Sequence, residues 1–179
     1  MDGRVCAITG HRPSRFKFKY SEDDTLCKKI KANMLEVFRE LHDEKEVRCF
    51  YVGGALGVDM WAAEQILRLK EQPGYGDIEL VVALPFVGHD AKWVQRSKRR
   101  MEFILQHCSR KEVIGNEDCR ESYVKRNCYM VDQANYLVAV YDDARNLRSG
   151  TMQCVRYARK NDVPVVLIHP DTANITYPM

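Results

Sequence analysis

Short apolar runs alternate along the chain with longer stretches in which apolar positions recur every three or four residues. The apolar runs predict strands, and the helical spacing predicts amphipathic helices. The predicted strands lie at residues 5–9, 47–52, 78–84, 111–115, 136–141 and 163–169. The predicted helices lie between them, at 26–41, 60–70, 93–108, 124–134 and 151–160. The polar tail after residue 169 predicts a loop or a surface extension.

The strongest predicted strands are apolar throughout, as in "VCAIT" and "YLVAVY". Such strands are buried on both faces, and strands that alternate with helices form a parallel sheet covered on both sides. The sequence therefore predicts one doubly wound α/β domain over residues 1–179, with a mostly parallel sheet between helix layers and a core from about residue 4 to 169. In such folds, ligands bind beyond the carboxyl ends of the strands.

Composition and charge exclude several classes of protein. Hydrophobic residues make up 45% and charged residues 30% of the chain, as in ordinary globular domains. No apolar run is long enough to cross a bilayer, and the first residues lack the pattern of a secretory signal. The net charge of +3 is too small to argue for nucleic acid or membrane binding. The seven scattered cysteines indicate reduced thiols in a cytoplasm, and no metal site is predicted.

The stretch "YVGGALGVDMWAAE" ends one predicted strand and begins the next helix. Gly53, Gly54 and Gly57 allow a sharp turn with exposed N–H groups, and the helix directs its positive end to the same place. The spacing fits neither GxGxxG nor Walker A, so we expect an anion site but no cofactor. Close packing of helix on sheet is the alternative. Asp59 would repel a phosphate, so we assign it to the helix start or to a ligand hydroxyl. We expect Gly54→Asp to abolish binding and preserve the fold.

The loop "TGHRP" follows the first predicted strand. Gly10 allows a tight turn, and Thr9, His11 and Arg12 bring a hydroxyl, an imidazole and a guanidinium together. A guanidinium suits a planar anion such as phosphate or carboxylate. The loop is therefore a candidate part of a ligand site, with a solvated Gly-Pro turn as the alternative.

A second glycine-containing turn precedes the last predicted helix. Gly150 and Thr151 begin this helix, so its N–H groups form an anion site of the same kind as the first. Asp142 and Asp143, in the preceding loop, are candidates for ribose hydroxyls or a metal, unless they are only solvated. Arg148 is a candidate to close over a ligand, because the loop 142–149 is long enough to act as a lid.

The motifs "TGHRP", "GGALGVDMWAAE", "RNCYMVDQANYLVAVYD" and "SGT" followed by "VRYA" together resemble the YpsA-like family, over most of the chain. That family belongs to the Rossmann-like SLOG superfamily, with the lonely-guy phosphoribohydrolases and the DNA-processing protein DprA. The resemblance implies a nucleotide-derived ligand held by two glycine-rich turns, and it places a ligand-binding arginine on Arg126. The catalytic glutamate of the phosphoribohydrolases falls on Cys154, which cannot replace a carboxylate, so the resemblance supports binding rather than hydrolysis.

We therefore expect a cytoplasmic binding protein or sensor for a nucleotide or a nucleotide-derived small molecule, without a complete catalytic set. One alternative is hydrolysis of the N-glycosidic bond of a nucleoside monophosphate, with Asp59, Asp142 or Asp143 in place of the missing glutamate. The other is binding of single-stranded DNA as in DprA, suggested by the basic run "RSKRR" at 96–100. Because the net charge is low, nucleic acid is not an expected partner. The superfamily resemblance is compatible with a homodimer.

Overall fold

One sheet of seven strands forms the centre of the computed structural model, which describes residues 3–145 and 147–179. The strands are β1 (Arg4–Gly10), β2 (Val47–Val52), β3 (Glu79–Leu84), β4 (Arg110–Val113), β5 (Tyr136–Val140), β6 (Val165–Ile168) and β7 (Ile175–Thr176). Their order is β4-β3-β2-β1-β5-β6-β7, and only β7 runs antiparallel to its neighbour. This arrangement confirms the predicted doubly wound, mostly parallel α/β fold.

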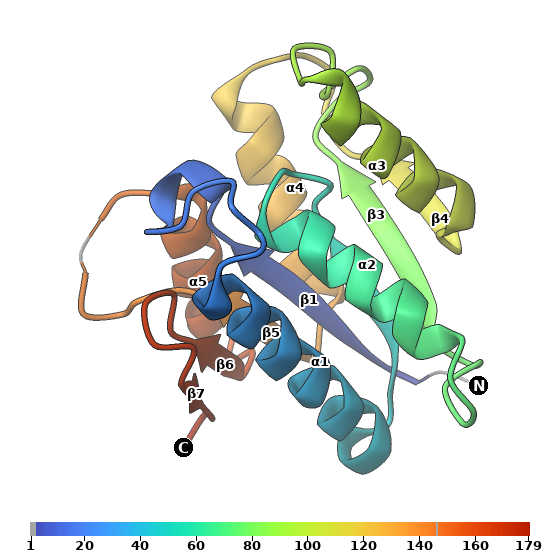
Figure 1. Cartoon of the computed structure of the whole chain (residues 1–179), viewed down its shortest axis with the longest axis vertical. Helices are drawn as coiled ribbons and strands as arrows, with labels where there is room; N and C mark the ends of the chain where they lie inside the picture. The colour runs from blue at the N-terminus through green and yellow to red at the C-terminus, as the bar shows by residue number, and fades with distance from the viewer. Residues whose placement is uncertain (1–2, 146) are drawn as a thin grey trace.

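Helices cover both faces of the sheet (Figure 1). On one face lie α1 (Thr25–Lys45), α2 (Val58–Lys70) and α3 (Gln95–His107), and on the other lie α4 (Arg120–Gln133) and α5 (Gly150–Lys160). A short 3-10 helix, η1 (Pro13–Arg15), follows β1. Within the described ranges, no helix is long and apolar enough to cross a membrane.

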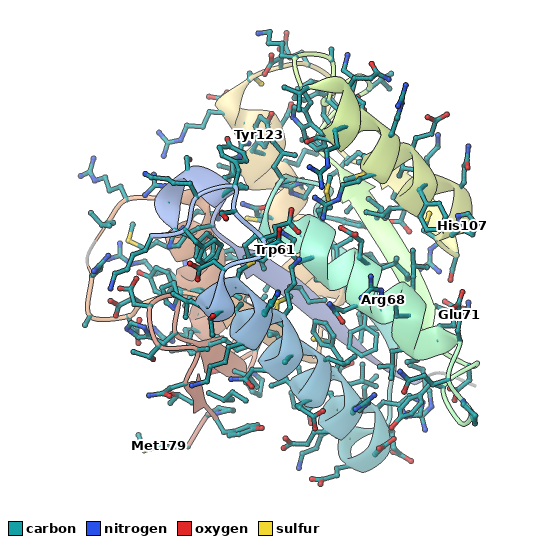
Figure 2. The ribbon with its side chains drawn as sticks, in the orientation of Figure 1. Trp61, Arg68, Glu71, His107, Tyr123 and Met179 are labelled. Atoms are coloured by element: carbon teal, nitrogen blue, oxygen red, sulfur yellow. The ribbon has the colours of Figure 1, made fainter. Side chains whose placement is uncertain are left out.

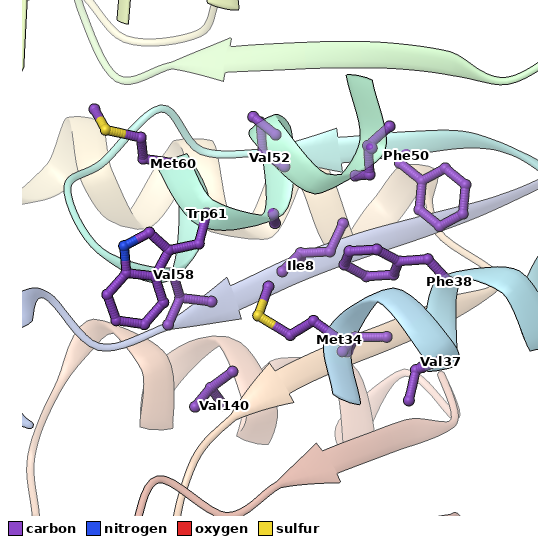
Figure 3. Packing of buried hydrophobic residues seen from close by; sticks show 14 of the residues in the cluster. Ile8, Met34, Val37, Phe38, Phe50, Val52, Val58, Met60, Trp61 and Val140 are labelled. Carbon is purple, nitrogen blue, oxygen red and sulfur yellow. The ribbon is translucent and has the colours of Figure 1, made fainter. Parts of the chain in front are cut away.

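Alternate residues of the central strands enter different helix layers, which explains why their sequences are apolar throughout. In β1, Cys6 and Ile8 belong to the core shared with α1, α2 and α3, whereas Ala7 belongs to the core shared with α4 and α5. In β5, Val138 belongs to the core shared with α1, α2 and α3, and Leu137 belongs to the core shared with α4 and α5. Figure 3 shows the larger core around Ile8, where side chains of α1 and α2 pack against the sheet. Burial on both faces thus fixes the position of β1 and β5 at the centre.

Two details differ from the sequence-based expectation. The third helix begins at Gln95, and Trp93 lies in the turn before it. The tail is not only a loop, because Ile175–Thr176 pairs with β6 as a short antiparallel edge strand. A strand of two residues has no periodicity to detect. Its formation depends on the exposed edge of β6, which the local sequence does not show.

Candidate functional site

The carboxyl end of β1 lies at the switch point of the sheet, with β2 on one side and β5 on the other. At such a point the chain connections leave in opposite directions and open a cleft. A cavity of about 1150 Å³ lies here, lined by the end of β1, the segment after it, the turn after β2 and facing parts of α4 and α5. Small-molecule pockets typically enclose roughly 300–1,000 Å³, so this cavity has room for a large ligand.

The structure brings most of the candidate site residues to this cavity. Nine of the twelve line it: Thr9, Gly10, His11, Arg12, Gly53, Asp59, Arg126, Gly150 and Thr151. Three of them do not line it: Gly54, Gly57 and Asp142. The two glycine-containing turns therefore reach the same cavity, but they contribute to it very differently.

The turn between β2 and α2 is largely occupied by the protein itself, which corrects the role expected for Gly54 and Gly57. At Gly57 (φ 85°), an added Cβ would lie 2.6 Å from the carbonyl oxygen of His11, and the amide of Val58 donates to that oxygen at 3.4 Å. At Gly54 (φ 70°), an added Cβ would lie 2.7 Å from Leu84 Cδ2. Both glycines are needed for positive φ and close packing. We now expect Gly54→Asp to disrupt the fold, contrary to our first expectation.

Arg126 and Asp59 fill the space beside Gly53. Both side chains are buried, and an added Cβ on Gly53 would lie 2.6 Å from Arg126 Nη1 and from Asp59 Oδ2. Arg126 donates to the carbonyl oxygen of Gly53, and its Nε donates to Asn127 Oδ1 at 2.9 Å. Asp59 accepts from the amide of Ala55 at 3.2 Å, at the start of α2. Arg126 therefore holds the protein's own backbone while it also lines the cavity, and its expected role as a phosphate partner remains a prediction. Asp59 supports the helix start.

Burial and the charge of the neighbouring residue shift the pKa values of Asp59 and Arg126 in opposite directions. Burial raises the pKa of Asp59, and the neighbouring charge of Arg126 opposes that rise. Burial likewise lowers the pKa of Arg126, and the charge of Asp59 opposes that fall. Because an isolated buried charge is strongly unfavourable, each of these residues depends on the other.

The turn between β5 and α5 is open to the cavity. Ser149 caps the helix, and its hydroxyl accepts from the amide of Met152 at 3.0 Å. The first amides of an α-helix have no partner within the helix, so those of Gly150 and Thr151 are directed to the cavity. Among residues 3–145 and 147–179, the nearest atom to an added Cβ on Gly150 is Asn127 Nδ2, at 3.7 Å. The space before this positively polarised helix end is therefore available to an anion.

The segment after β1 faces the start of α5. His11 Nδ1 lies 3.5 Å from Thr151 Oγ1. Burial, assisted by the charge of Arg15, lowers the pKa of His11, so its neutral form is favoured at neutral pH. Arg12 lies over the ring of Tyr123, with its Cζ 5.6 Å from the ring centre. Figure 2 marks Tyr123 on α4, beside the segment that follows β1. This side of the cavity combines a neutral hydrogen-bonding group with exposed guanidinium groups.

Further residues of α4 and α5 line the cavity, in addition to the site residues predicted from the sequence. They share helical spacing of three or four positions and a polar or basic character, and they are Arg120, Tyr123, Asn127, Gln153, Arg156, Tyr157 and Lys160. Such spacing places residues on one face of a helix. These polar stripes were the signal in the sequence that could have identified them.

The cavity is strongly basic even though the chain is nearly neutral. Two carboxylates line it, those of Asp59 and Asp118, against seven basic side chains: Arg12, Arg15, Arg120, Arg126, Arg148, Arg156 and Lys160. Clefts lined by one sign of charge concentrate ligands of the opposite sign. The arrangement therefore favours an anionic ligand.

The aspartates of the loop before α5 are engaged outside the cavity. Asp142 lies 3.4 Å from both Arg145 Nε and His169 Nε2. Asp143 accepts two hydrogen bonds of 2.8 Å from Arg159. Asp142 does not line the cavity, so its expected contact with a ribose or a metal remains a prediction. Asn146, within the candidate lid 142–149, lies outside the described residues, and the lid remains a prediction.

Cys154, at the position of the phosphoribohydrolase glutamate, is not placed for chemistry. Its side chain is 1% exposed, and burial raises the pKa of the thiol to about 12. The thiol therefore remains protonated. Cys154 also does not line the cavity. Residues 3–145 and 147–179 contain no group of three or more His, Cys, Asp or Glu side chains that could hold a metal ion.

Solved structures with the same fold are DNA processing proteins. A structure of DNA processing protein A from Helicobacter pylori, which reports its single-stranded DNA binding mode, matches with a TM-score of 0.59 and 19% identity. DprA from Streptococcus pneumoniae matches with a TM-score of 0.59 and 16% identity. These matches cover 93% and 92% of this chain, but only 66% and 50% of those two chains. Our expectation that nucleic acid is an unlikely partner was wrong as an inference from net charge, because the DNA processing protein A of Helicobacter pylori, which has this fold, binds single-stranded DNA.

Relatives at the level of sequence are bacterial UPF0398 proteins. One from Bacillus velezensis is 26% identical over 141 residues, covering 78% of this chain and 75% of that protein. One from Bacillus thuringiensis is 27% identical over 146 residues, covering 79% of this chain and 76% of that protein. The YpsA family model, described as the YspA SLOG family, matches residues 6–173. This match spans nearly the whole sheet and every helix of the cavity, and the chain belongs to the YspA SLOG family.

Proposed function

We propose that this protein is a cytoplasmic binding protein for a nucleotide or a nucleotide-derived ligand. The observation that carries the proposal is the amino end of α5, where Gly150 and Thr151 line a strongly basic cavity and the Thr151 hydroxyl lies 3.5 Å from His11 Nδ1. A helix amino end binds phosphate well, because its amides and its dipole both favour negative charge. The seven free thiols support a reducing compartment.

The cavity supports binding better than hydrolysis. Of the two carboxylates that line it, Asp59 is buried and accepts a hydrogen bond from the Ala55 amide, and Asp118 is exposed. General acid–base catalysis needs a group that can exchange a proton with the substrate. Asp142 and Asp143, the other candidates to replace the missing glutamate, are held in ion pairs elsewhere.

The direct test is stabilisation of the protein by a panel of nucleotides, measured by chemical or thermal denaturation. A ligand at a hundredfold excess over its Kd should raise the free energy of unfolding by about 2.7 kcal/mol. In Gly150→Asp, the added carboxylate stands at the first helical position, where it stabilises the helix but opposes an anion. We expect this variant to fold normally and to lose at least about tenfold in affinity, about 1.4 kcal/mol.

Gly76→Asp is the matched control, because no atom of the described part of the chain, apart from its sequence neighbours, lies within 4 Å of an added Cβ on Gly76, and the residue does not line the cavity. It should bind as the wild type does. The proposal fails if no nucleotide stabilises the protein, or if a folded Gly150→Asp protein keeps full affinity.

Binding of single-stranded DNA is a second candidate function. It is favoured by the seven basic side chains of the cavity and by the DNA processing proteins that share the fold. Basic grooves with aromatic side chains such as Tyr123 are typical of proteins that bind single strands. The two functions use the same cavity, so mononucleotides should compete with a strand for it.

A further inference from the structure

A groove between α2 and α3 lies on the other side of the sheet from the candidate site, with a volume of about 630 Å³. The two helices lie side by side over the same face of the sheet (Figure 1). Residues three or four positions apart share one side of a helix. The lining residues have this spacing on both helices, with Leu67, Arg68 and Glu71 on α2 and Arg96, Arg99 and Phe103 on α3.

Three arginines of this groove have no partner within the described part of the chain. Arg68, Arg96 and Arg99 are exposed, and no hydrogen bond or ion pair to a described residue holds their guanidinium groups. The neighbouring Arg100 differs, because two carboxylates of the protein hold it. Guanidinium groups form their strongest hydrogen bonds with carboxylates and phosphates. The groove therefore offers three cationic donors to an anionic partner.

Apolar side chains lie beside these charges. The side chain of Phe103 is 54% exposed, and Leu67 packs against the core while it also lines the groove. Exposed aromatic side chains next to arginines are typical of protein–protein interfaces, where both residue types are enriched. A partner that fits the groove must therefore supply apolar contact as well as negative charge.

The form of the groove favours a helix as the partner. Two packed helices present ridges and a furrow into which a third, amphipathic helix can lay its apolar side. Along α3, the distance from Arg96 to Phe103 is roughly 10 Å, or two helical turns. A nucleic acid strand would leave the apolar part unused, and a bilayer is too flat to enter the groove. A second copy of this chain would add the same guanidinium groups to the interface, and like charges oppose association.

We propose that the groove between α2 and α3 binds an acidic amphipathic helix of a partner protein. The apolar side of that helix packs on Leu67 and Phe103, and its carboxylates accept hydrogen bonds from Arg68, Arg96 and Arg99. The groove and the candidate site lie on opposite faces of the sheet, so both can be occupied at once. The proposal does not depend on the proposed nucleotide-binding function.

The test selects binders of the whole protein from a displayed library of helical peptides, each about 15 residues long so that a helix can form in water. We expect the selected peptides to be acidic, with apolar residues at spacings of three and four. Fluorescence anisotropy then measures their affinities for the wild type and the variants. Phe103→Ala, and Arg96→Gln with Arg99→Gln, should each weaken binding about tenfold or more. Binding should also weaken as the salt concentration rises.

Lys28→Gln with Lys29→Gln is the matched control. It removes the same charge from exposed positions on α1 that line neither the groove nor the candidate site, so the affinities should stay unchanged. The substituted groove residues are exposed, so circular dichroism should show folded variants. The proposal fails if no acidic helical peptide is selected, or if the selected peptides bind both groove variants as tightly as the wild type.

Three further measurements test the other occupants of the groove. They are anisotropy with an oligothymidylate, co-sedimentation with phosphatidylserine vesicles, and sedimentation equilibrium of the protein alone. We expect the groove variants to change none of these results. Loss of strand binding, vesicle binding or self-association in Arg96→Gln with Arg99→Gln would assign the groove to that occupant and overturn the proposal.

Discussion

At the scale of single residues, the buried pair of Arg126 and Asp59 determines the shape of the cavity floor. Arg126 holds the carbonyl of Gly53, and Asp59 holds the amide of Ala55, so the pair fixes both sides of the turn after β2. Neither charge is tolerable in this environment without the other, since the desolvation of one isolated buried ion is strongly unfavourable. The pair is therefore a structural element with one face on the cavity.

We predict that Arg126→Met lowers the free energy of unfolding by about 3–5 kcal/mol, because it leaves the Asp59 carboxylate buried without a counter-charge. Lys125→Met, at the neighbouring exposed position, should change stability by less than about 0.5 kcal/mol. Urea denaturation measures both values.

The double variant Arg126→Met with Asp59→Asn separates loss of the charge pair from loss of packing. If the pair acts as described, the double variant is more stable than Arg126→Met alone. Two outcomes would show that Asp59 does not depend on this arginine. One is that the two substitutions lower the free energy of unfolding additively, and the other is that Arg126→Met lowers it by less than about 1 kcal/mol.

At the scale of elements, α3 is attached to the rest of the fold by an ion network as much as by its core. Met101 and Ile104 are its buried residues. Arg100 donates to Glu22 at 2.6 Å and to Glu64 at 2.5 Å, and so joins α3 to the loop before α1 and to α2. The basic run at 96–100 is thus partly structural, because one of its arginines is held by two carboxylates.

This network predicts a dependence of stability on pH. Burial of Glu22 would raise its pKa, but hydrogen bonds and charges from Arg100 and Lys31 outweigh burial and lower the pKa from 4.5 to about 2. A carboxyl with a lowered folded-state pKa stabilises the protein above its unfolded pKa. This stabilisation, on the order of 2 kcal/mol, should therefore be complete above about pH 4.5 and disappear towards pH 2.

The measurement compares the wild type with Glu22→Gln by urea denaturation across that pH range. The free energies of unfolding of the two proteins should differ above pH 4.5 and become equal towards pH 2. Glu102→Gln, an exposed position on α3, should follow the wild type throughout. A difference between the wild type and Glu22→Gln that is independent of pH would contradict the predicted role of this carboxylate.

At the scale of the whole molecule, charge is distributed unevenly over the two helix layers. One basic surface is the cavity beside α4 and α5, and the other is a groove between α2 and α3 that includes Arg68, Arg96 and Arg99. These surfaces lie on opposite faces of the sheet. The net charge of +3 therefore conceals two separate regions that could attract a polyanion.

We predict that a single strand of DNA, if it binds, occupies the cavity and not the groove. Binding through about five phosphates should give a slope of log K against log salt of about −3.5. Gly150→Asp should weaken this binding, whereas Arg96→Gln with Arg99→Gln should not. Fluorescence anisotropy over a salt series measures both effects, and the reverse pattern would assign the strand to α2 and α3.

The sequence by itself determined the fold class and the location of the cavity. Apolar runs such as "VCAIT" are local features, and their burial on both faces requires a sheet between two helix layers. The cavity follows from the same reasoning, because the switch point of such a sheet lies at its carboxyl edge. Gly150 and Thr151 were recognisable because a helix start is itself a local signal.

Only the tertiary structure decided which groups face the cavity. Gly54 and Gly57 have the composition of an anion site, but they do not line the cavity, and Leu84 and His11, distant in sequence, lie where a side chain on either residue would be. Arg126 lines the cavity, but it also donates to the carbonyl oxygen of Gly53, a contact that its residue type alone does not predict. Such assignments depend on contacts between segments far apart in the chain. Residue type supplies the chemistry of a group, and long-range packing determines which partner that group meets.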